Sequence, residues 1–138
     1  MIAYLDASVI LRVVLGQPNA LPDLLQVELG VASALAEVEC LRTLDRLRLR
    51  APVSDQQLAR AREAVYGLTA EMELVEPTTP ILRTAAHPLP TPLGALDAIH
   101  LATALRWIEV RGKALMMATH DAALGLAARA CGLQVIGV

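Results

Sequence analysis

The stretch GALDAIHLATAL, residues 94–105, places one carboxylate, Asp97, at the start of a long apolar helical run. Few positions of this run and its continuation are polar, and the large apolar residues are Leu96, Ile99, Leu101, Leu105 and Ile108. We therefore expect a mostly buried helix whose acid lies near the interior. The first turn of a helix favours negative charge by ~0.3–1 kcal/mol, which accounts for such an acid without a function. The alternative is that Asp97 is one of several carboxylates that converge on a metal ion.

Length and composition limit the class of protein. The chain has 138 residues, enough for one domain over residues 1–138 with a substantial core, and 55% of them are hydrophobic. No window of ~18 residues is free of charge, so we expect no transmembrane helix. An acid in the apolar N-terminal run argues against a signal peptide, so we expect a cytoplasmic protein. The apolar excess favours an oligomer. Cys40 and Cys131 lack metal-ligand spacing and are typical of small core residues.

Short apolar runs alternate with helical patterns, which predicts an α/β domain with a mainly parallel sheet. Runs typical of strands occupy residues 2–5, 29–32, 72–75, 114–118 and 133–138. Helical patterns cover residues 9–15, 21–27, 34–49, 55–70, 95–110 and 122–130, and a short helix begins at Thr78 with proline in its first turn. Ser33 and Ser54 are predicted helix caps, the latter in a capping box with Gln57, and the proline-rich segment 87–92 is a predicted loop.

The helix predicted over residues 34–49 carries two acids, Glu37 and Glu39. Its apolar face is predicted to consist of Leu35, Val38, Leu41, Leu44 and Leu47. Glu39 lies beside this face and Glu37 lies away from it, so Glu39 is the better candidate for an inward carboxylate. Arg42, Arg46 and Arg50 follow at helical spacing, and they are either a solvated face or a phosphate-binding one.

Four acids occupy positions that an α/β topology can bring to one edge of the sheet. Asp6 and Asp121 follow predicted strands, near Ser8 and Thr119 respectively, whereas Glu39 and Asp97 lie on helices. Two carboxylates ~4 Å apart repel by up to ~4 kcal/mol at an effective dielectric constant of 20. The fold must therefore bind a cation at this edge or protonate some of the acids. Ligands that are all oxygens suit Mg²⁺ or Mn²⁺, ions that usually act on phosphates.

Four blocks of the sequence resemble the signature blocks of the PIN domain, in the form found in VapC-type toxins of bacterial type II toxin–antitoxin pairs. These blocks are MIAYLDASVILRVVLG, SALAEVECLRTL, LGALDAIHLATAL and MATHDAALGLAARACGLQVIGV. They span the whole chain in the order and spacing of the family. The resemblance implies a PIN-like three-layer α/β/α domain with a mainly parallel central sheet of about four to five strands.

The resemblance further implies an endoribonuclease that depends on Mg²⁺ or Mn²⁺. Its catalytic and metal-binding acids fall on Asp6, Glu39, Asp97 and Asp121, and Ser8 and Thr119 match hydroxyl positions that support the first and last acids. Water would attack the phosphorus and leave a 5′ phosphate and a 3′ hydroxyl. Arg42 and Arg46 are candidates for binding the RNA, for which the resemblance implies tRNA or rRNA. The expected partners are a second copy of the chain and a VapB-like antitoxin, whose carboxyl-terminal segment would lie over an apolar groove between the early helices.

Other interpretations remain open. A phosphatase of the haloacid dehalogenase type needs a second acid two residues after the nucleophile, where this chain has Ser8, and a suitably placed lysine, of which the chain has only Lys113. A catalytically silent PIN-like module that binds RNA or protein is the main alternative. A purely structural interpretation makes each acid a helix cap or turn residue.

The histidines and aromatic residues suggest packing more than chemistry. We expect His100, one helical turn after Asp97, to be a satisfied core residue, although it could approach a metal or phosphate. His120 is expected near the rim of the site, and His87 is expected to be exposed. Trp107 and Tyr66 are expected to pack in the core and not to stack on bases.

Overall fold

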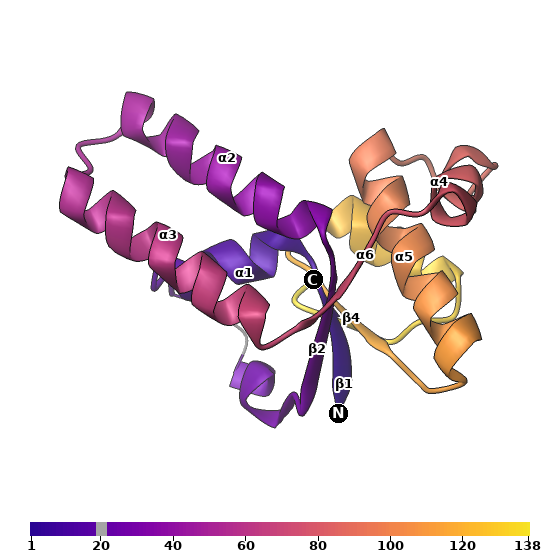
Figure 1. Cartoon of the computed structure of the whole chain (residues 1–138). Coiled ribbons are helices and arrows are strands. Elements are labelled where there is room, and N and C mark those ends of the chain that lie inside the picture. Colours follow the sequence, from indigo (N-terminus) through magenta and orange to yellow (C-terminus); the bar gives the residue numbers. More distant parts are fainter. Residues whose placement is uncertain (19–21) are drawn as a thin grey trace.

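The computed structural model describes residues 1–18 and 22–138 of the chain (Figure 1). Five strands alternate with the helices: β1 Ile2–Leu5, β2 Leu29–Ser33, β3 Glu73–Val75, β4 Met116–Ala118 and β5 Val135–Ile136. The helices are α1 Ala7–Val14, the 3₁₀ helix η1 Pro22–Gln26, α2 Leu35–Arg50, α3 Asp55–Ala70, α4 Thr79–Ala86, α5 Ala95–Arg111 and α6 Ala122–Ala130. The order matches the predicted one. The predicted helix 21–27 begins at a position outside the described residues.

The strands form one sheet in the order β3-β2-β1-β4-β5, with every recorded pairing parallel. The register places Leu5 of β1 beside Ala118 of β4, and Tyr4 beside Val31 of β2. Strand order changes direction between β1 and β4, because the chain moves outward through β2 and β3 and then returns to the other side of β1. Ligands of open α/β sheets bind outside the carboxyl ends of the strands at such a switch point. The predicted parallel α/β sheet is confirmed.

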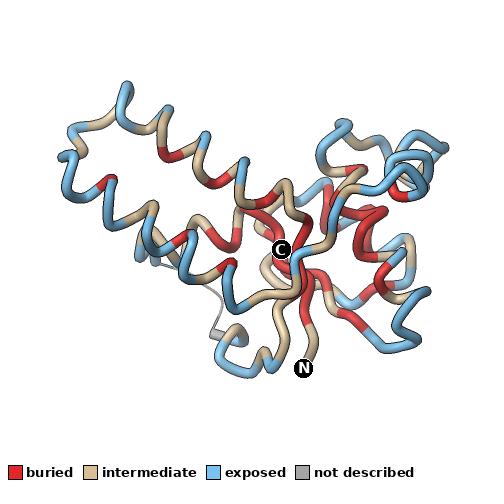
Figure 2. Tube along the Cα trace, in the orientation of Figure 1, coloured by how far each residue is buried: buried red, intermediate tan, exposed pale blue. Residues whose placement is uncertain are grey.

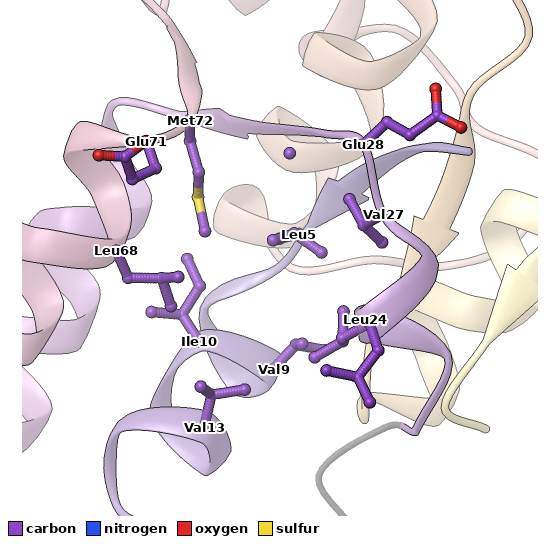
Figure 3. A pocket seen from close by; sticks show the side chains of 12 residues that line it. Leu5, Val9, Ile10, Val13, Leu24, Val27, Glu28, Leu68, Glu71 and Met72 are labelled. Atoms are coloured by element: carbon purple, nitrogen blue, oxygen red, sulfur yellow. The ribbon is translucent and has the colours of Figure 1, made fainter.

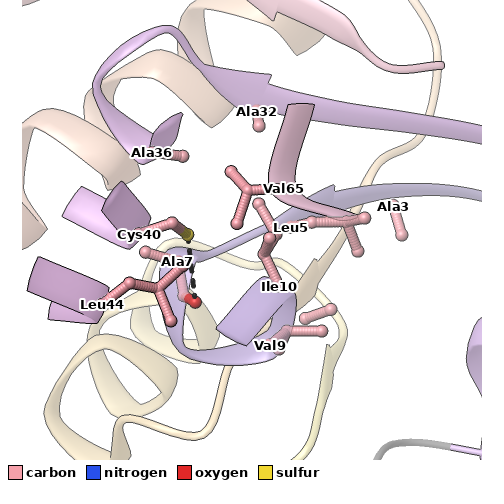
Figure 4. Packing of buried hydrophobic residues seen from close by; sticks show 11 residues of the cluster. Ala3, Leu5, Ala7, Val9, Ile10, Ala32, Ala36, Cys40, Leu44 and Val65 are labelled. Carbon is pink, nitrogen blue, oxygen red and sulfur yellow. Dashed lines mark hydrogen bonds between the residues drawn. The ribbon is translucent and has the colours of Figure 1, made fainter. Parts of the chain in front are cut away.

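Successive residues of each strand face opposite sides of the sheet, and each side has its own core. On one side Ala3, Leu5 and Ala32 pack with buried residues of α1, α2 and α3 (Figure 4). On the other side Tyr4, Val31 and Met117 pack with buried residues of α5 and α6. The buried residues therefore follow the sheet and the inner sides of the helices (Figure 2). This arrangement confirms the predicted three layers.

Helices α2 and α3 form an antiparallel pair that extends away from the sheet (Figure 1). Pro52 lies in the turn between them, after α2 has ended at Arg50. The predicted capping box opens α3: Ser54 Oγ accepts from the Gln57 amide at 3.1 Å, and Gln57 Oε1 accepts from the Ser54 amide at 3.0 Å. The turn is thus fixed by local side-chain chemistry.

The structure corrects the predicted buried face of α2. The fully buried residues are Ala36, Cys40 and Leu44, spaced four apart, whereas Val38 is 56% exposed. Ala36 and Cys40 are small, so the helix lies close to the neighbouring elements along the side that carries them. This side lies next to the row of large apolar residues that helical periodicity predicts to be buried. Cys40 Sγ contacts the Ala7 carbonyl at 3.8 Å (Figure 4). Burial, followed by the charge of Glu39, raises the pKa of Cys40 to about 12.

Several smaller predictions also have an outcome. Ser33 ends β2, and its hydroxyl accepts from the Leu35 amide at 3.2 Å, but the N-cap residue of α2 is Ala34. Trp107 is buried as predicted. Tyr66 is 48% exposed and is not in the core, contrary to the prediction, whereas Cys131 is partly buried and packs against the core of the α5–α6 side. Over residues 1–18 and 22–138, none of the helices has the length and apolarity needed to span a bilayer.

Candidate active site

The site lies at the switch point of the sheet, where β1 and β4 end side by side. Asp6 directly follows β1, and its amide donates to the carbonyl of Ala118, the last residue of β4, at 3.1 Å. Asp121 follows β4 by three residues and begins α6. Adjacent parallel strands therefore bring to one edge two acids that are far apart in the sequence.

The Asp6 carboxylate is buried and held by two hydroxyl groups. Ser8 Oγ donates to Asp6 Oδ2 at 2.6 Å and Thr119 Oγ1 donates to the same oxygen at 2.9 Å. Ser8 Oγ also accepts from the His120 amide at 3.0 Å. Hydrogen bonds to the charged form stabilise a buried carboxylate and fix its orientation. Asp6 is therefore a preorganised acid with Oδ1 on the side away from the two hydroxyls.

Asp121 serves as a helix cap as well as a site residue. Its Oδ1 accepts from the Leu124 amide at 2.9 Å, which satisfies one free donor of the first turn of α6. Its own amide donates to Thr119 Oγ1 at 3.0 Å. The pairing of hydroxyls with acids thus differs from the expectation. Ser8 and Thr119 both hold the carboxylate of Asp6, and Thr119 supports only the backbone of Asp121.

The two acids of α2 have different surroundings. Glu37 Oε2 accepts from Thr69 Oγ1 of α3 at 2.7 Å, so Glu37 joins the two helices of the projecting pair. Glu39 Oε1 instead accepts from His100 Nε2 at 2.5 Å, and the same nitrogen lies 3.9 Å from Asp6 Oδ1. Glu39, and not Glu37, therefore shares the nitrogen of His100 with Asp6.

Asp97 occupies the first turn of α5, where the negative charges of the other three acids act on it. Burial, then the charges of Asp121 and Asp6, raise its pKa, with a smaller contribution from Glu39, while His100 opposes the shift. His100 is fully buried, as expected of a core histidine. Burial alone lowers the pKa of His100. The hydrogen bond to Glu39 and the charges of Glu39, Asp6 and Asp97 together raise it by more than burial lowers it, so the pKa lies above its ordinary value. Four acids thus share one electrostatic environment.

The donor set fits a hard divalent cation in charge and chemistry, because it consists of carboxylate oxygens. In residues 1–18 and 22–138, no three His, Cys, Asp or Glu side chains converge closely enough to hold a metal ion as they stand. Like charges without a counterion repel, so separated carboxylates are what electrostatics favours in the protein alone. Part of the set is nevertheless fixed in place, through the bonds to Asp6, Asp121 and Glu39.

Comparison with known proteins identifies the family. The family model described as "PIN domain" matches residues 3–123. The chain belongs to the PIN domain family. This PIN domain is also 33% identical to Ribonuclease VapC46 of Mycobacterium tuberculosis, in an alignment that covers 96% of this chain and 95% of that protein. The resemblance to VapC-type proteins inferred from the four sequence blocks is confirmed.

Solved structures with the same fold support this assignment. A toxin–antitoxin complex from Klebsiella pneumoniae matches with a TM-score of 0.60 and 18% identity over 86% of each chain. The crystal structure of PAE2754 from Pyrobaculum aerophilum matches with a TM-score of 0.63 and 20% identity, over 98% of this chain and 84% of that chain. At these identities the likeness establishes the fold of the PIN domain.

The remaining candidate residues of the PIN domain, two arginines and two histidines, differ in their exposure and contacts. Arg42 and Arg46 are exposed on α2, where Arg42 pairs with Asp45 and Arg46 donates to Thr43 Oγ1. His120 Nδ1 contacts the Gly137 carbonyl at 3.2 Å. His87 is exposed, as expected.

Sequence reasoning missed Tyr4, whose hydroxyl lies 2.7 Å from His100 Nδ1 and accepts from the Ser33 amide at 3.1 Å. The available signal was a tyrosine inside an otherwise aliphatic strand, because a buried phenol needs a polar partner.

Proposed function

We propose that this PIN domain is a metal-dependent endoribonuclease of the VapC type that hydrolyses phosphodiester bonds of RNA. The observation that carries the proposal is the grouping of Asp6, Glu39, Asp97 and Asp121 around the ends of β1 and β4. Burial is the largest cause of the upward shift in the pKa of Asp97, and the charges of Asp121, Asp6 and Glu39 add to it, in keeping with this grouping. A bound Mg²⁺ or Mn²⁺ would relieve the repulsion, and the relative named Ribonuclease VapC46 supports RNA as the substrate.

The four carboxylates would hold the cation, which when bound supplies the positive charge that attracts a phosphate oxygen and lowers the pKa of a water molecule. Asp6 is already fixed by Ser8 and Thr119, so it needs little rearrangement to act as a ligand. Hydrolysis by water would leave a 5′ phosphate and a 3′ hydroxyl. Attack by the 2′ hydroxyl of RNA would need a general base paired with a general acid. His100 Nε2 already donates to Glu39, so it is not free to form such a pair with His120, and the chain has a single lysine, Lys113.

Arg42 and Arg46 are proposed to bind RNA phosphates next to the site, since both are exposed on the helix that carries Glu39. Changing both to Gln is expected to raise KM for RNA with little effect on kcat. The same change should flatten the dependence of binding on salt, because each phosphate contact releases a counterion. An unchanged salt dependence would make this side of α2 a solvated face only.

The proposed protein partners are a second copy of the chain and a VapB-like antitoxin. The structural match to a toxin–antitoxin complex supports only the antitoxin. A groove of about 340 Å³ between α1, η1 and the end of α3 offers the antitoxin an apolar surface (Figure 3). Val9, Ile10, Val13, Leu68 and Met72 line it, and Val13 is 39% exposed. Introducing a charge by Val13→Asp should weaken antitoxin binding at least ~10-fold, because a charge in an apolar contact must lose its hydration.

The nuclease is tested by incubating purified protein with total cellular RNA in Mg²⁺, in Mn²⁺ and in EDTA. We expect discrete fragments with 5′ phosphates that require the metal. A matched pair on α2 gives the control: Glu39→Gln should abolish cleavage, whereas Glu37→Gln, two residues away and bonded to Thr69, should retain it. Mapping the fragment ends would identify the RNA target.

The alternative is a silent PIN-like module that binds RNA or protein without cleaving it. Retention of all four acids argues against this function, since a binding module has no need to keep repelling carboxylates together. The silent module would be supported if the wild-type protein binds the metal but cleaves no RNA in its presence, and if its RNA pattern is the same as that of Glu39→Gln.

A further inference from the structure

His100 connects the sheet to an acid of the site through both of its ring nitrogens. It lies on α5 with no solvent exposure. Nδ1 is 2.7 Å from the hydroxyl of Tyr4 on β1, and Nε2 is 2.5 Å from Oε1 of Glu39 on α2. A core histidine needs partners for its nitrogens, but it does not need a partly exposed carboxylate from another helix as one of them.

Counting hydrogens assigns the direction of the bond between His100 and Glu39. The Ser33 amide can only donate, so the oxygen of Tyr4 accepts from it at 3.1 Å. Because Glu39 faces Nε2, the ring hydrogen of a neutral His100 lies on Nε2, and Nδ1 then accepts from the Tyr4 hydroxyl. In a charged His100, Nδ1 donates to the second lone pair of the Tyr4 oxygen. Glu39 accepts from Nε2 whether His100 is neutral or charged, since a carboxylate can only accept. The bond to Glu39 therefore persists in both states.

Glu39 needs this support more than Asp6 or Asp121 does. Asp6 is held by two hydroxyls and Asp121 by a backbone amide, whereas Glu39 has a longer side chain with 22% of its surface exposed. Without a partner, repulsion from Asp6 would push Glu39 toward solvent. His100 counters this, since Nε2 faces Glu39 at 2.5 Å and Asp6 at 3.9 Å.

We propose that His100 is a positioning residue for Glu39, and that Tyr4 acts through His100 by fixing the orientation of the imidazole ring. Glu39 Oε1 is held by the imidazole, which leaves Oε2 for the divalent cation. The inference rests on the proposed function, because it concerns how the carboxylates are prepared for that cation. Hydrogen-bond partners of metal ligands commonly contribute 10–100-fold to metal affinity.

Metal binding by the protein alone tests this inference without relying on activity. Isothermal titration calorimetry with Mn²⁺ is expected to show ~10–100-fold weaker binding in His100→Leu than in wild type. His100→Gln keeps an N–H group on a side chain of similar reach and should restore the affinity to within a few-fold of wild type. Leu44→Val on α2 removes a buried methylene group away from the site, and it should lower the melting temperature without changing Mn²⁺ affinity.

A second variant tests the part assigned to Tyr4. Tyr4→Phe removes the hydroxyl and should weaken Mn²⁺ binding in the wild-type background, but it should cause no further loss in His100→Leu, because residues that act through one another are not additive. If His100→Leu does not fold, Tyr4→Phe alone decides. The proposal is overturned if the deciding variant, His100→Leu or Tyr4→Phe, unfolds cooperatively and binds Mn²⁺ within about twofold of the wild-type affinity. His100 would then serve only in packing.

Failure of the proposed function would give a different result. If wild-type protein binds no Mn²⁺, or if Asp6→Asn and Glu39→Gln bind it as tightly as wild type, the carboxylates are not a metal site and both proposals fall. If wild type binds Mn²⁺ through these acids but His100→Leu binds it equally well, only the positioning function of His100 is rejected.

Discussion

At the scale of single residues, the candidate site is built from hydrogen bonds between distant parts of the sequence. Thr119 reaches Asp6 across 113 positions, and His100 reaches Glu39 across 61. These bonds hold carboxylates that would otherwise move apart by mutual repulsion. The order present before any cation binds reduces the rearrangement that binding requires.

Asp97→Asn is expected to raise the melting temperature of the metal-free protein. Burial and the neighbouring acids raise the pKa of Asp97, so the folded state disfavours its charge, and an amide of the same shape removes that penalty. Nuclease activity should fall at least ~100-fold with the loss of a metal ligand. Calorimetry in EDTA checks the first effect, with Glu63→Gln on the exposed side of α3 as the control. A lower melting temperature for Asp97→Asn would contradict the clustered acids.

Much of the candidate site could be predicted at this scale because acids at the ends of strands and helices leave a local signal. Asp6 and Asp121 follow strands, and Asp97 lies in a first turn. The function of Tyr4 could not be predicted in this way. Its contact with His100 joins β1 to α5, and no local pattern encodes which buried groups will face each other.

At the scale of elements, local chemistry predicts where helices begin and end better than which side they bury. The capping box of α3 and the proline start of α4 both lie where the sequence indicates. The buried face of α2 was predicted only in part, because Leu44 is buried as predicted, whereas Ala36 and Cys40 make the other close contacts and Val38 is exposed. Burial depends on the shape of the neighbouring elements as well as on periodicity.

Ser54→Ala is expected to lower the free energy of unfolding by about 1 kcal/mol, since it removes the side-chain acceptor that caps α3. Denaturation in urea should show a lower midpoint with an unchanged slope. Gln56→Ala alters an exposed neighbour outside the capping box and serves as the control. Equal midpoints for the two variants would mean that the capping box contributes nothing to stability.

At the scale of the whole molecule, the sequence predicts a parallel α/β sheet but not the order of its strands. Alternating strands and helices lead to parallel pairing, because each helix returns the chain to the same end of the sheet. The order β3-β2-β1-β4-β5 depends on which side of β1 receives β4, a choice made by packing on both faces. That choice creates the switch point at which Asp6 and Asp121 meet.

The metal-free protein is expected to lose thermal stability as the pH rises from about 5 to 8. The folded state raises the pKa of Asp97 above an unfolded value of about 3.9, so its contribution falls as the pH rises through the folded pKa. The folded state also raises the pKa of His100 above its unfolded value of about 6.5. The stability that protonated His100 contributes below pH 6.5 is therefore lost as the pH rises through the folded pKa. Both effects therefore have the same sign.

Melting temperatures measured in EDTA across this pH range check the expectation. A double variant, Asp97→Asn with His100→Gln, should show a flatter pH dependence than wild type. Saturating Mg²⁺ should also flatten it, since a cation that binds the folded state favours the ionised carboxylates. A melting temperature that rises steadily from pH 5 to pH 8 would contradict the upward pKa shifts.

The position of β4 beside β1 has a consequence for synthesis on the ribosome. Asp6 and Ser8 are made more than a hundred residues before Thr119, which completes the pair of hydroxyls on Asp6. A nascent chain therefore has no complete site until β4 and the first turn of α6 have left the exit tunnel. The activity proposed for this protein would be withheld from the growing polypeptide, and the machinery that translates it would be exposed to that activity only after Thr119 has been made.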